Sequence, residues 1–459
     1  MRPRYIAFSL MAAFSTSSPA FADTTVSDET NQVIQRIQEE QRSLVGQLVS
    51  LNHGKMVEAS DKGFKDSVSL QLNMPCNLDR ALCQYAKPYE IEFANQIAKL
   101  PDGSVKVTST PLLNAAQRLV AAMFWKKGDP ITLEHLLRAD GSIYSTLSVQ
   151  AFTFKEKKDS VNAAPLVLHF DTTADKASRQ FNVGLDLVKV VSKTMSGQLK
   201  GFKTQGTLDL THKELGYGKA SGSLAAFEVK DANRYYPVQF RMLNVLGSSQ
   251  SGANPEAGFT DSSADLSIQS IRVNKVNLKN FHFAISLRHI DNSIVELLNR
   301  FNKHEKQQKL SAIDEPGSIA FGELDELLDK LPSYVNTHPE LEISDLSVNL
   351  GQGIFKFTGK VGLGDADATL KPAEAAQQAV IATAEFSVPR KAVIGFVTQV
   401  INSQKSMTAS TRKSEIKNLN DQINSFTKMG WLVEEKGILK SAVRFEKNSL
   451  TINGVKQGK

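Results

Sequence analysis

The sequence has few of the residue patterns that mark enzymes and metal proteins. It contains two cysteines, two tryptophans and eight histidines in 459 residues. No two histidines stand in H-x-H or H-x-x-x-H spacing and none lies beside a cysteine, so we predict no metal and no cofactor. The nucleophile motif G-x-S-x-G and the phosphate motifs G-x-x-x-x-G-K-[ST] and G-x-G-x-x-G do not occur. We therefore expect a protein that is not an enzyme.

Concentrated charge and long apolar runs are also missing. The formal net charge of +6 is spread along the chain, without a Lys/Arg-rich block that contains aromatic residues. This pattern predicts no nucleic-acid partner, and it leaves only a mild attraction to anionic envelope lipids. Beyond the first residues, no segment approaches the roughly 18 apolar residues of a membrane helix. We expect no transmembrane helix in the mature chain.

Residues 1–22 are the clearest targeting signal. Arg2 and Arg4 precede an apolar run over residues 5–14, and Ala20 and Ala22 supply an A-x-A cleavage pattern. These features predict a signal peptide that is removed from an exported, periplasmic protein. The alternative is an uncleaved anchor, for which about ten apolar residues are too few to cross a bilayer.

Cys76 and Cys83 lie close together in the segment PCNLDRALC. In an oxidising compartment, two nearby thiols are expected to form one short-loop disulfide. A redox C-x-x-C motif or a zinc site would need a different spacing or more ligands. The cysteines therefore predict a structural link.

Residues 23–52 are expected to form a long N-terminal amphipathic helix. Its apolar residues recur at near-heptad spacing, with Gln41 in the series: Ile34, Ile37, Leu44, Leu48 and Leu51. This seam either packs along the body of the protein or pairs with a second copy to give a homodimer. The polar face carries both charge signs, which argues against a basic membrane-surface helix.

The rest of the chain is typical of a β-rich α+β fold. Many short alternating segments separated by Gly, Asn and Asp predict an extended, curved antiparallel sheet with amphipathic helices packed on one face. We expect a first lobe over residues 53–247, a flexible polar loop over 248–263 and a second lobe over 264–459. The second lobe should contain strand-to-helix units and end in a meander of three strands.

Phenylalanine is the abundant aromatic residue, with 24 copies against eight tyrosines. Five phenylalanines stand at inward alternation on the predicted strands of the second lobe: Phe281, Phe283, Phe355, Phe357 and Phe386. Such residues form a core or, if the sheet curves, the floor of an apolar groove for an acyl chain or an extended peptide. His282 falls on the polar side of the same hairpin and is expected to face solvent.

The C-terminal passage GWLVEEKGILKSAVRFEKNSLTINGVK resembles the end of the YdgA-like family of bacterial envelope proteins. The residues that carry this resemblance are Gly430, Trp431, Leu432, Phe445, Leu450, Thr451, Asn453 and Gly454. Looser similarity extends back to about residue 63. The resemblance implies an exported, β-rich envelope protein with a domain of unknown function, and it supplies no catalytic residues.

Three functions are consistent with these observations. The first is a non-enzymatic envelope protein that binds a lipid or a protein partner on its sheet. The second is a structural or assembly protein that self-associates through its N-terminal helix. The third is a hydrolase whose site the motifs do not identify.

Overall fold

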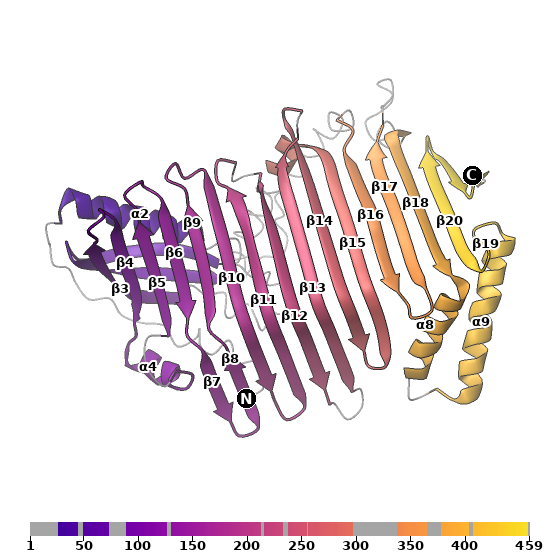
Figure 1. The fold of residues 1–459 in the computed structure, drawn as a ribbon, viewed down its shortest axis with the longest axis horizontal. Helices are drawn as coiled ribbons and strands as arrows, with labels where there is room; N and C mark the ends of the chain where they lie inside the picture. Colours follow the sequence, from indigo (N-terminus) through magenta and orange to yellow (C-terminus); the bar gives the residue numbers. More distant parts are fainter. Residues whose placement is uncertain are drawn as a thin grey trace, which may run out of the picture. The chain divides into compact units, whose positions relative to one another are not determined.

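The computed structural model describes residues 26–44, 49–72, 89–125, 130–212, 215–232, 237–254, 256–296, 337–364, 378–403 and 407–457. The predicted signal peptide, Leu48, Cys76 and Cys83 lie outside the described residues. Within the described ranges the chain is β-rich, with a large open antiparallel sheet and few helices (Figure 1). The described residues divide into two compact units: the first holds those up to Lys193 together with Lys203–Thr211, and the second holds the rest.

The first unit is a meander in which neighbouring strands pair antiparallel. Its strands are β1 (Val49–Ser60), β2 (Gly63–Leu72), β3 (Tyr89–Lys99), β4 (Val105–Leu112), β5 (Ile131–Leu137), β6 (Ile143–Val149), β7 (Phe152–Glu156), β8 (Asp159–Ala163), β9 (Leu166–Thr172) and β10 (Ser178–Val191). The register that pairs β6 with β9 continues without a shift into the pair β7–β8. β10 pairs with both β9 and β8. A further helix, α4 (Ala115–Ala122), follows β4.

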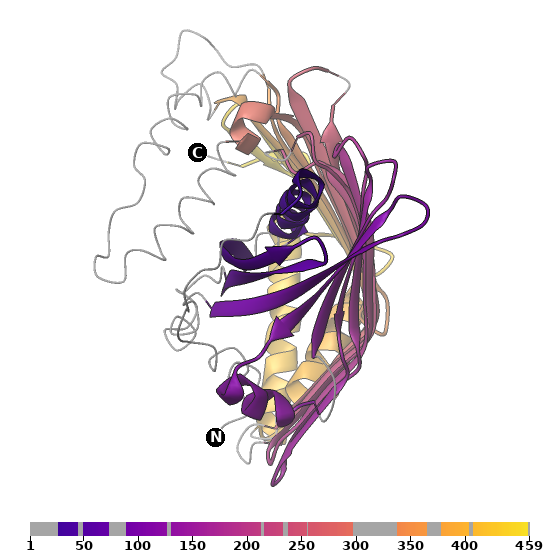
Figure 2. The ribbon, with the colours of Figure 1, turned by 90° about the vertical axis from the view of Figure 1, so that its left-hand side faces the viewer.

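Helix α2 (Asp28–Leu44) lies across the hairpin ends of the first unit (Figure 2). Its start is tied to the β1–β2 turn, where the hydroxyl of Ser27 donates a 2.6 Å hydrogen bond to Asp61. Its later turns reach the β9–β10 turn, where Lys176 Nζ lies 2.7 Å from Glu39. Ile34 and Ile37 are buried in the core of this unit.

The expected extent of the N-terminal helix is wrong at its end. Leu44 is the last residue of α2, and Leu51 lies in β1, which pairs with β2 from Val49 onward. The near-heptad spacing continues through Leu51, but pairing with a strand further along the chain overrides this local pattern. The spacing of apolar residues along the sequence gives no information about the pairing of β1 with β2.

The second unit is also a meander. Its strands are β12 (Gly218–Asp231), β13 (Val238–Ala253), β14 (Phe259–Val273), β15 (Val276–Asp291), β16 (Glu340–Asn349), β17 (Ile354–Leu363), β18 (Val380–Pro389), β19 (Val433–Glu435), β20 (Ile438–Glu446), β21 (Ser449–Ile452) and β22 (Val455–Lys456). Each strand from β12 to β17 pairs with the next, and β18 pairs with β17 and β20. β11 (Met195–Asp209) contributes residues to both units.

The predicted flexible loop over residues 248–263 is wrong. Residues 248–253 and 259–263 form the facing ends of β13 and β14, with Ser248 opposite Asp265 and Ser251 opposite Ser262. Serine and glycine are common in loops, but here they line a polar hairpin whose backbone hydrogen bonds hold the strands together. The division between the units falls instead around β11.

Two helices pack against one side of the second sheet. α8 (Arg390–Ser403) follows directly from β18, and α9 (Ala409–Lys428) packs beside α8. Thr408 caps α9, because its side chain accepts a hydrogen bond from the backbone N–H of Thr411. We call the side of this sheet that carries α8 and α9 the helix side, and the other the open side.

Candidate functional site

The five predicted phenylalanines belong to the helix side of the second sheet. Three of them lie in one register row that runs from β15 to β18: Phe283 faces Leu346, Leu346 faces Phe357, and Phe357 faces Phe386. Residues that face each other across antiparallel strands project from the same side of the sheet. The alternation in the sequence therefore predicted their common side.

Two of the phenylalanines form core beneath the helices. The rings of Phe355 and Phe386 stack with centroids 6.4 Å apart, and both pack against a cluster of buried residues from the strands and both helices. The cluster contains Val388, Ala392, Ile423 and Leu439. Phe357 leans over Gly359, since a Cβ on that glycine would lie 3.2 Å from the ring. Phe355 and Phe386 are thus packing residues and are not free to contact a ligand.

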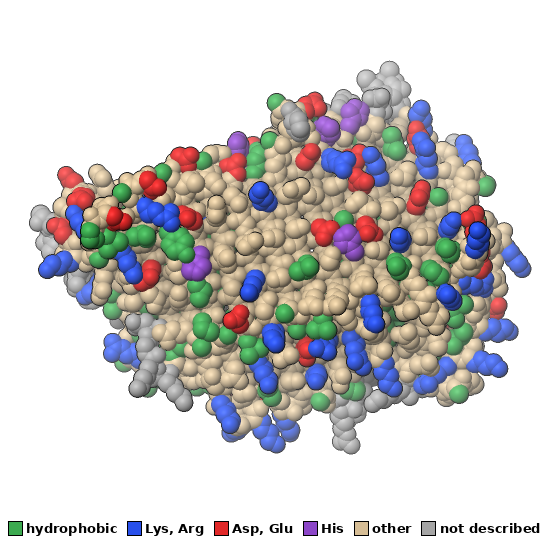
Figure 3. Space-filling view, in the orientation of Figure 1, with side chains coloured by type: hydrophobic (Ala, Val, Ile, Leu, Met, Phe, Trp, Pro, Cys, Tyr) green, Lys and Arg blue, Asp and Glu red, His purple; other side chains and the backbone are tan. Residues whose placement is uncertain are grey.

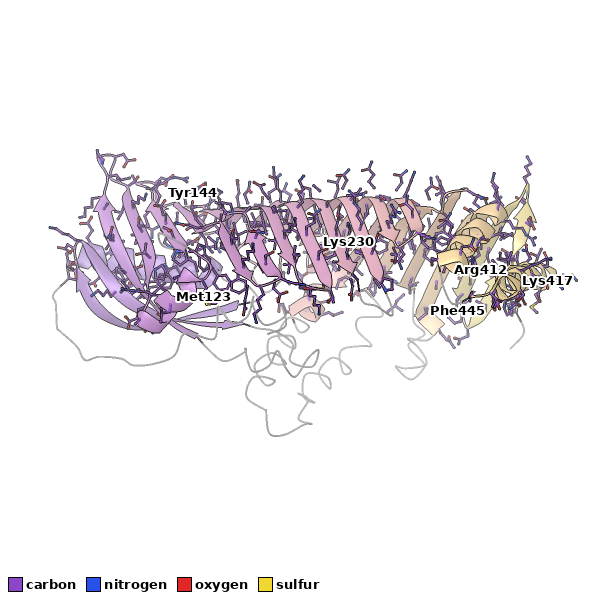
Figure 4. The ribbon with its side chains drawn as sticks, turned by 90° about the horizontal axis from the view of Figure 1, so that it is seen from below. Met123, Tyr144, Lys230, Arg412, Lys417 and Phe445 are labelled. Carbon is purple, nitrogen blue, oxygen red and sulfur yellow. The ribbon has the colours of Figure 1, made fainter. Side chains whose placement is uncertain are left out.

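A different set of apolar residues lies outside this cluster on the helix side; four of its members are exposed, and Ala382 and Phe445 are partly buried. It forms one register row across six strands, which we call the exposed row: Leu287, Leu341, Val361, Ala382, Phe445 and Leu450. The exposed fractions are 38% for Leu287, 36% for Leu341 and 46% for Val361. Phe445 is labelled in Figure 4. Contiguous exposed apolar surface of this kind marks binding sites more often than isolated apolar residues do.

The exposed row is long enough for an extended hydrocarbon chain. Six neighbouring strands at about 4.8 Å spacing place its ends about 24 Å apart. One acyl chain spans about half of the roughly 30 Å hydrocarbon core of a bilayer. The adjacent row is also apolar and contains Ile285, Ile343, Gly359, Ala384 and Val443. Together the two rows make a strip that a single acyl chain could cover.

The open side carries a polar cluster on β14, β15 and β16. His282 Nδ1 lies 2.8 Å from Asp345, and its Nε2 lies 2.7 Å from Asp265. Hydrogen bonds to Asp345 and Asp265 raise the pKa of His282. Both ring nitrogens can donate to carboxylates only in the imidazolium form, so the geometry and the pKa agree. His282 was expected to face solvent on the polar side, but no spacing rule indicated its two partners.

The first unit buries polar side chains beneath α2. Glu40 and Arg179 form a 2.8 Å ion pair with side chains only 4% and 3% exposed, and Thr172 donates to Glu40. Gln41, the polar residue of the apolar seam, contacts His135 Nε2 at 3.2 Å. Two of the proposed self-association residues, Ile34 and Ile37, are 4% and 0% exposed in the same interface. They could meet a second copy only if α2 left its own sheet.

Ser145 and His135 are a serine–histidine pair, but their geometry does not suit hydrolysis. The amide nitrogen of Gln41 can only donate, so His135 Nε2 accepts and Nδ1 carries the proton that is donated to Ser145 Oγ, 2.8 Å away. A general base would have to accept a proton from the serine instead. Burial lowers the pKa of His135 to about 3, and both side chains are 0% exposed. No substrate can reach this pair in the folded chain.

Within the described ranges, no group of three or more His, Cys, Asp or Glu side chains is placed to hold a metal ion. No helix in the same ranges is both long and apolar enough to cross a bilayer.

A family model described as "Bacterial protein of unknown function (DUF945)" matches residues 86–457. The chain belongs to this family. The match covers all of the second unit's described strands and helices and the first unit from β3 onward. For this DUF945 protein, neither a search of the curated proteins nor one of the solved structures found a match.

Proposed function

We propose that this DUF945 protein is an exported, periplasmic envelope protein of the YdgA-like type that binds the acyl chain of a lipid and catalyses no reaction. The observation that carries the proposal is the exposed row, whose most exposed member is Val361 at 46%. The proposed disulfide between Cys76 and Cys83 and the cleaved leader are consistent with an oxidising compartment.

The exposed row alone provides a modest binding energy. Burying a whole Leu or Val side chain contributes about 1.5–3 kcal/mol, so covering the exposed part of each contributes roughly 1 kcal/mol. Three neighbouring exposed residues of the row, Leu287, Leu341 and Val361, would then provide about 3 kcal/mol, which is less than millimolar binding requires. A ligand must also cover the adjacent row, where Ile285, Ile343 and Val443 add apolar area.

Binding can be tested with the full chain, a fluorescent fatty acid and native mass spectrometry. Val361→Asp places a charge in the exposed row and should weaken fatty-acid binding by about tenfold or more. Ile354→Asp is the matched control, because Ile354 lies on the same strand, is 48% exposed and alternates to the open side. Equal effects of the two substitutions, or a wild-type protein that binds no fatty acid, would exclude this site.

Export needs a separate test. A fusion of the chain to alkaline phosphatase should be active, because that enzyme folds only where its disulfides can form. Deleting residues 2–22 should abolish the activity. An active fusion without the leader would contradict the predicted signal peptide.

The packing of α2 in the first unit argues against the alternative that the protein self-associates through this helix. Self-association through α2 would have to expose Ile34 and Ile37 and separate the buried pair Glu40–Arg179. Analytical ultracentrifugation of the full chain tests this alternative directly. A dimer that is lost in Ile37→Asp without loss of helicity would revive it.

A further inference from the structure

Four neighbouring strands of the second sheet, β12 to β15, each carry one basic residue near the same end. We call the set the cation line: Lys230, Arg241, Arg272 and Lys279. All four residues are exposed, and Lys230 is labelled in Figure 4. Figure 3, which shows the open side, also has blue Lys and Arg side chains gathered near the lower ends of the strands of the second sheet. This end of the sheet is therefore basic.

The register places the cation line on one side of the sheet. Arg241 faces Glu228 on one neighbouring strand and Arg272 on the other. Lys230 stands two residues after Glu228 on β12. Lys279 stands two residues after the partner of Arg272 on β15. Facing residues, and residues two apart on one strand, project from the same side, so the four cations share one side.

That side is the helix side. Along β14, the residues that alternate with Arg272 are Ser270, Ile268 and Leu266. Leu266 faces Phe283, which belongs to the phenylalanine row of the helix side. The cation line and the exposed row therefore lie on the same side of the second sheet.

Carboxylates leave most of the cation line unneutralised. Within the described part of the chain, the carboxylate that pairs with the line is Glu228, 2.8 Å from Arg241. In the same ranges, Lys230, Arg272 and Lys279 form no ion pair. Helix α8, which contacts β15, has no acidic residue. Four cations against one carboxylate leave an excess of three positive charges.

The facing pair Arg241–Arg272 is unfavourable for folding by itself. Like charges directly opposite each other on neighbouring strands destabilise a sheet. Glu228 pairs with Arg241, whereas Arg272 Nε donates a 2.9 Å hydrogen bond to the backbone oxygen of Asn274. The terminal nitrogens of Arg272 have no partner within the described ranges, and they carry four of the five guanidinium N–H donors. A bound anion would use these donors and offset the repulsion.

The next residues on the helix side of β12–β15 are apolar. They form two register rows: Leu224, Val245, Ile268 and Phe281 in the first, and Gly222, Gly247, Leu266 and Phe283 in the second. Beyond them, Ile285 begins the row adjacent to the exposed row. A basic strand end followed by apolar rows matches an anionic headgroup followed by acyl chains. A soluble phosphate compound would leave these rows uncovered.

We infer that the cation line binds the phosphate headgroup of an anionic phospholipid. Arginine and lysine are the side chains that proteins use to bind phosphate groups. One phospholipid spans about 20 Å, which is half of the roughly 40–45 Å thickness of a bilayer with its headgroups. The strand from Lys279 to Ile285 also spans about 20 Å. A lipid with its phosphate at the cation line therefore reaches the adjacent row with its acyl chains.

This inference rests on the proposed lipid binding and names the class of lipid. The two proposals can fail separately. Fatty-acid binding and Val361→Asp test the exposed row, whereas preference for one headgroup over another tests the cation line.

Native mass spectrometry of the full chain with equal amounts of phosphatidylglycerol and phosphatidylcholine tests the inference. The wild type should retain about tenfold more phosphatidylglycerol. The double variant Arg272→Glu and Lys279→Glu should bind phosphatidylglycerol about 25-fold more weakly and keep its phosphatidylcholine binding, because each cation beside an anionic headgroup contributes about fivefold. Its control is Lys356→Glu and Lys417→Glu, which makes the same charge change on the open side and on α9 and should alter binding little.

Stability separates a binding defect from unfolding. Arg272→Glu replaces a facing pair of like charges by a pair of opposite charges, so this variant should unfold at a higher urea concentration than the wild type. Weaker phospholipid binding by the more stable variant cannot result from loss of the fold.

Three results would overturn the inference. They are equal binding of the two phospholipids by the wild type, equal losses in the test and control double variants, and displacement of phosphatidylglycerol by an equal concentration of glycerol 3-phosphate. The last result would assign the cation line to a soluble phosphate compound. Fatty-acid binding that persists beside any of them would leave the proposed function intact. Headgroup preference without fatty-acid binding would instead overturn the role of the exposed row and support the cation line.

Discussion

The two units attach their helices to their sheets in different ways. In the first unit, α2 buries Glu40 against Arg179 and Gln41 against His135. In the second unit, α8 and α9 contact the sheet through an apolar cluster, and the ion pair of α8 with β19, Arg390–Glu434 at 2.9 Å, is partly exposed. Buried polar groups are stable only when paired, so the first arrangement tolerates one position of the helix. Apolar packing constrains the position of a helix less. On the second sheet, α8 and α9 leave the exposed row uncovered.

This difference suggests a division of roles. The buried hydrogen-bond partners of α2 come from β5, β9 and β10, so the helix links strands that are distant along the chain. The surface that we assign to a ligand, the exposed row, lies in the second unit. Substitutions in the two helix contacts test whether the polar attachment of the first unit is the more fragile of the two.

The largest expected effect is in the buried ion pair. Arg179→Met leaves the carboxylate of Glu40 buried without its cation and should lower the free energy of unfolding of the first unit by about 3–5 kcal/mol. Lys176→Met is the control, because it removes the exposed pair with Glu39 between the same elements and should cost less than about 1 kcal/mol. Urea denaturation with hydrogen exchange of α2 measures both. Equal losses of unfolding free energy in the two variants would contradict the proposal that the buried pair is the stronger attachment of α2.

The helix contact of the second unit should be the next most sensitive. Phe386→Ala removes a ring that packs beneath α8 and α9 and should cost about 2–4 kcal/mol, with loss of hydrogen-exchange protection in α8. Phe283→Ala is in the same register row but outside that cluster, so its cost should be smaller by about 1 kcal/mol or more. A larger cost for Phe283 would mean that the helices cover more of the row than the cluster indicates.

Local signals in the sequence predicted turns and strands well. The Asp140-Gly141 pair is a strong local hairpin signal, and the structure pairs β5 with β6 there, with Gly141 at a φ of 89°. Gly430, at a φ of 77°, follows the last turn of α9 as a glycine at that position should. These features depend on a few adjacent residues, which is why sequence alone identifies them.

Long-range contacts could not be predicted in the same way. Glu40 and Arg179 are 139 residues apart, and no spacing in the sequence links them. The alternation placed the phenylalanines on one side of a sheet, but it could not indicate that α8 and α9 cover Phe355 and Phe386 and leave Val361 exposed. Whether a helix covers a given side chain depends on where that helix packs, and the packing position depends on the whole fold.

A smaller effect is expected at the start of α9. Thr408→Ala removes the acceptor for the backbone N–H of Thr411 and should cost about 1 kcal/mol. Faster hydrogen exchange should be confined to the first turn of the helix. Thr408→Ser keeps the hydroxyl and should restore the wild-type rates, whereas a serine variant as unstable as the alanine variant would show that the methyl group matters instead.

The smallest effect is expected at His282 and should depend on pH. Its pKa is raised by Asp345 and Asp265, so the stabilisation is complete below the unfolded value near pH 6.5 and is lost as the pH rises through the folded pKa. The stability difference between the wild type and His282→Gln should thus be largest below about pH 6.5, at about 0.2–1 kcal/mol for such partly exposed pairs, and should shrink as the pH rises. Urea titrations across this range measure it, with His289→Gln as the control because His289 has one carboxylate contact at 3.3 Å. A difference that instead grows from pH 6 to pH 8 would mean that neutral His282 holds the three strands together.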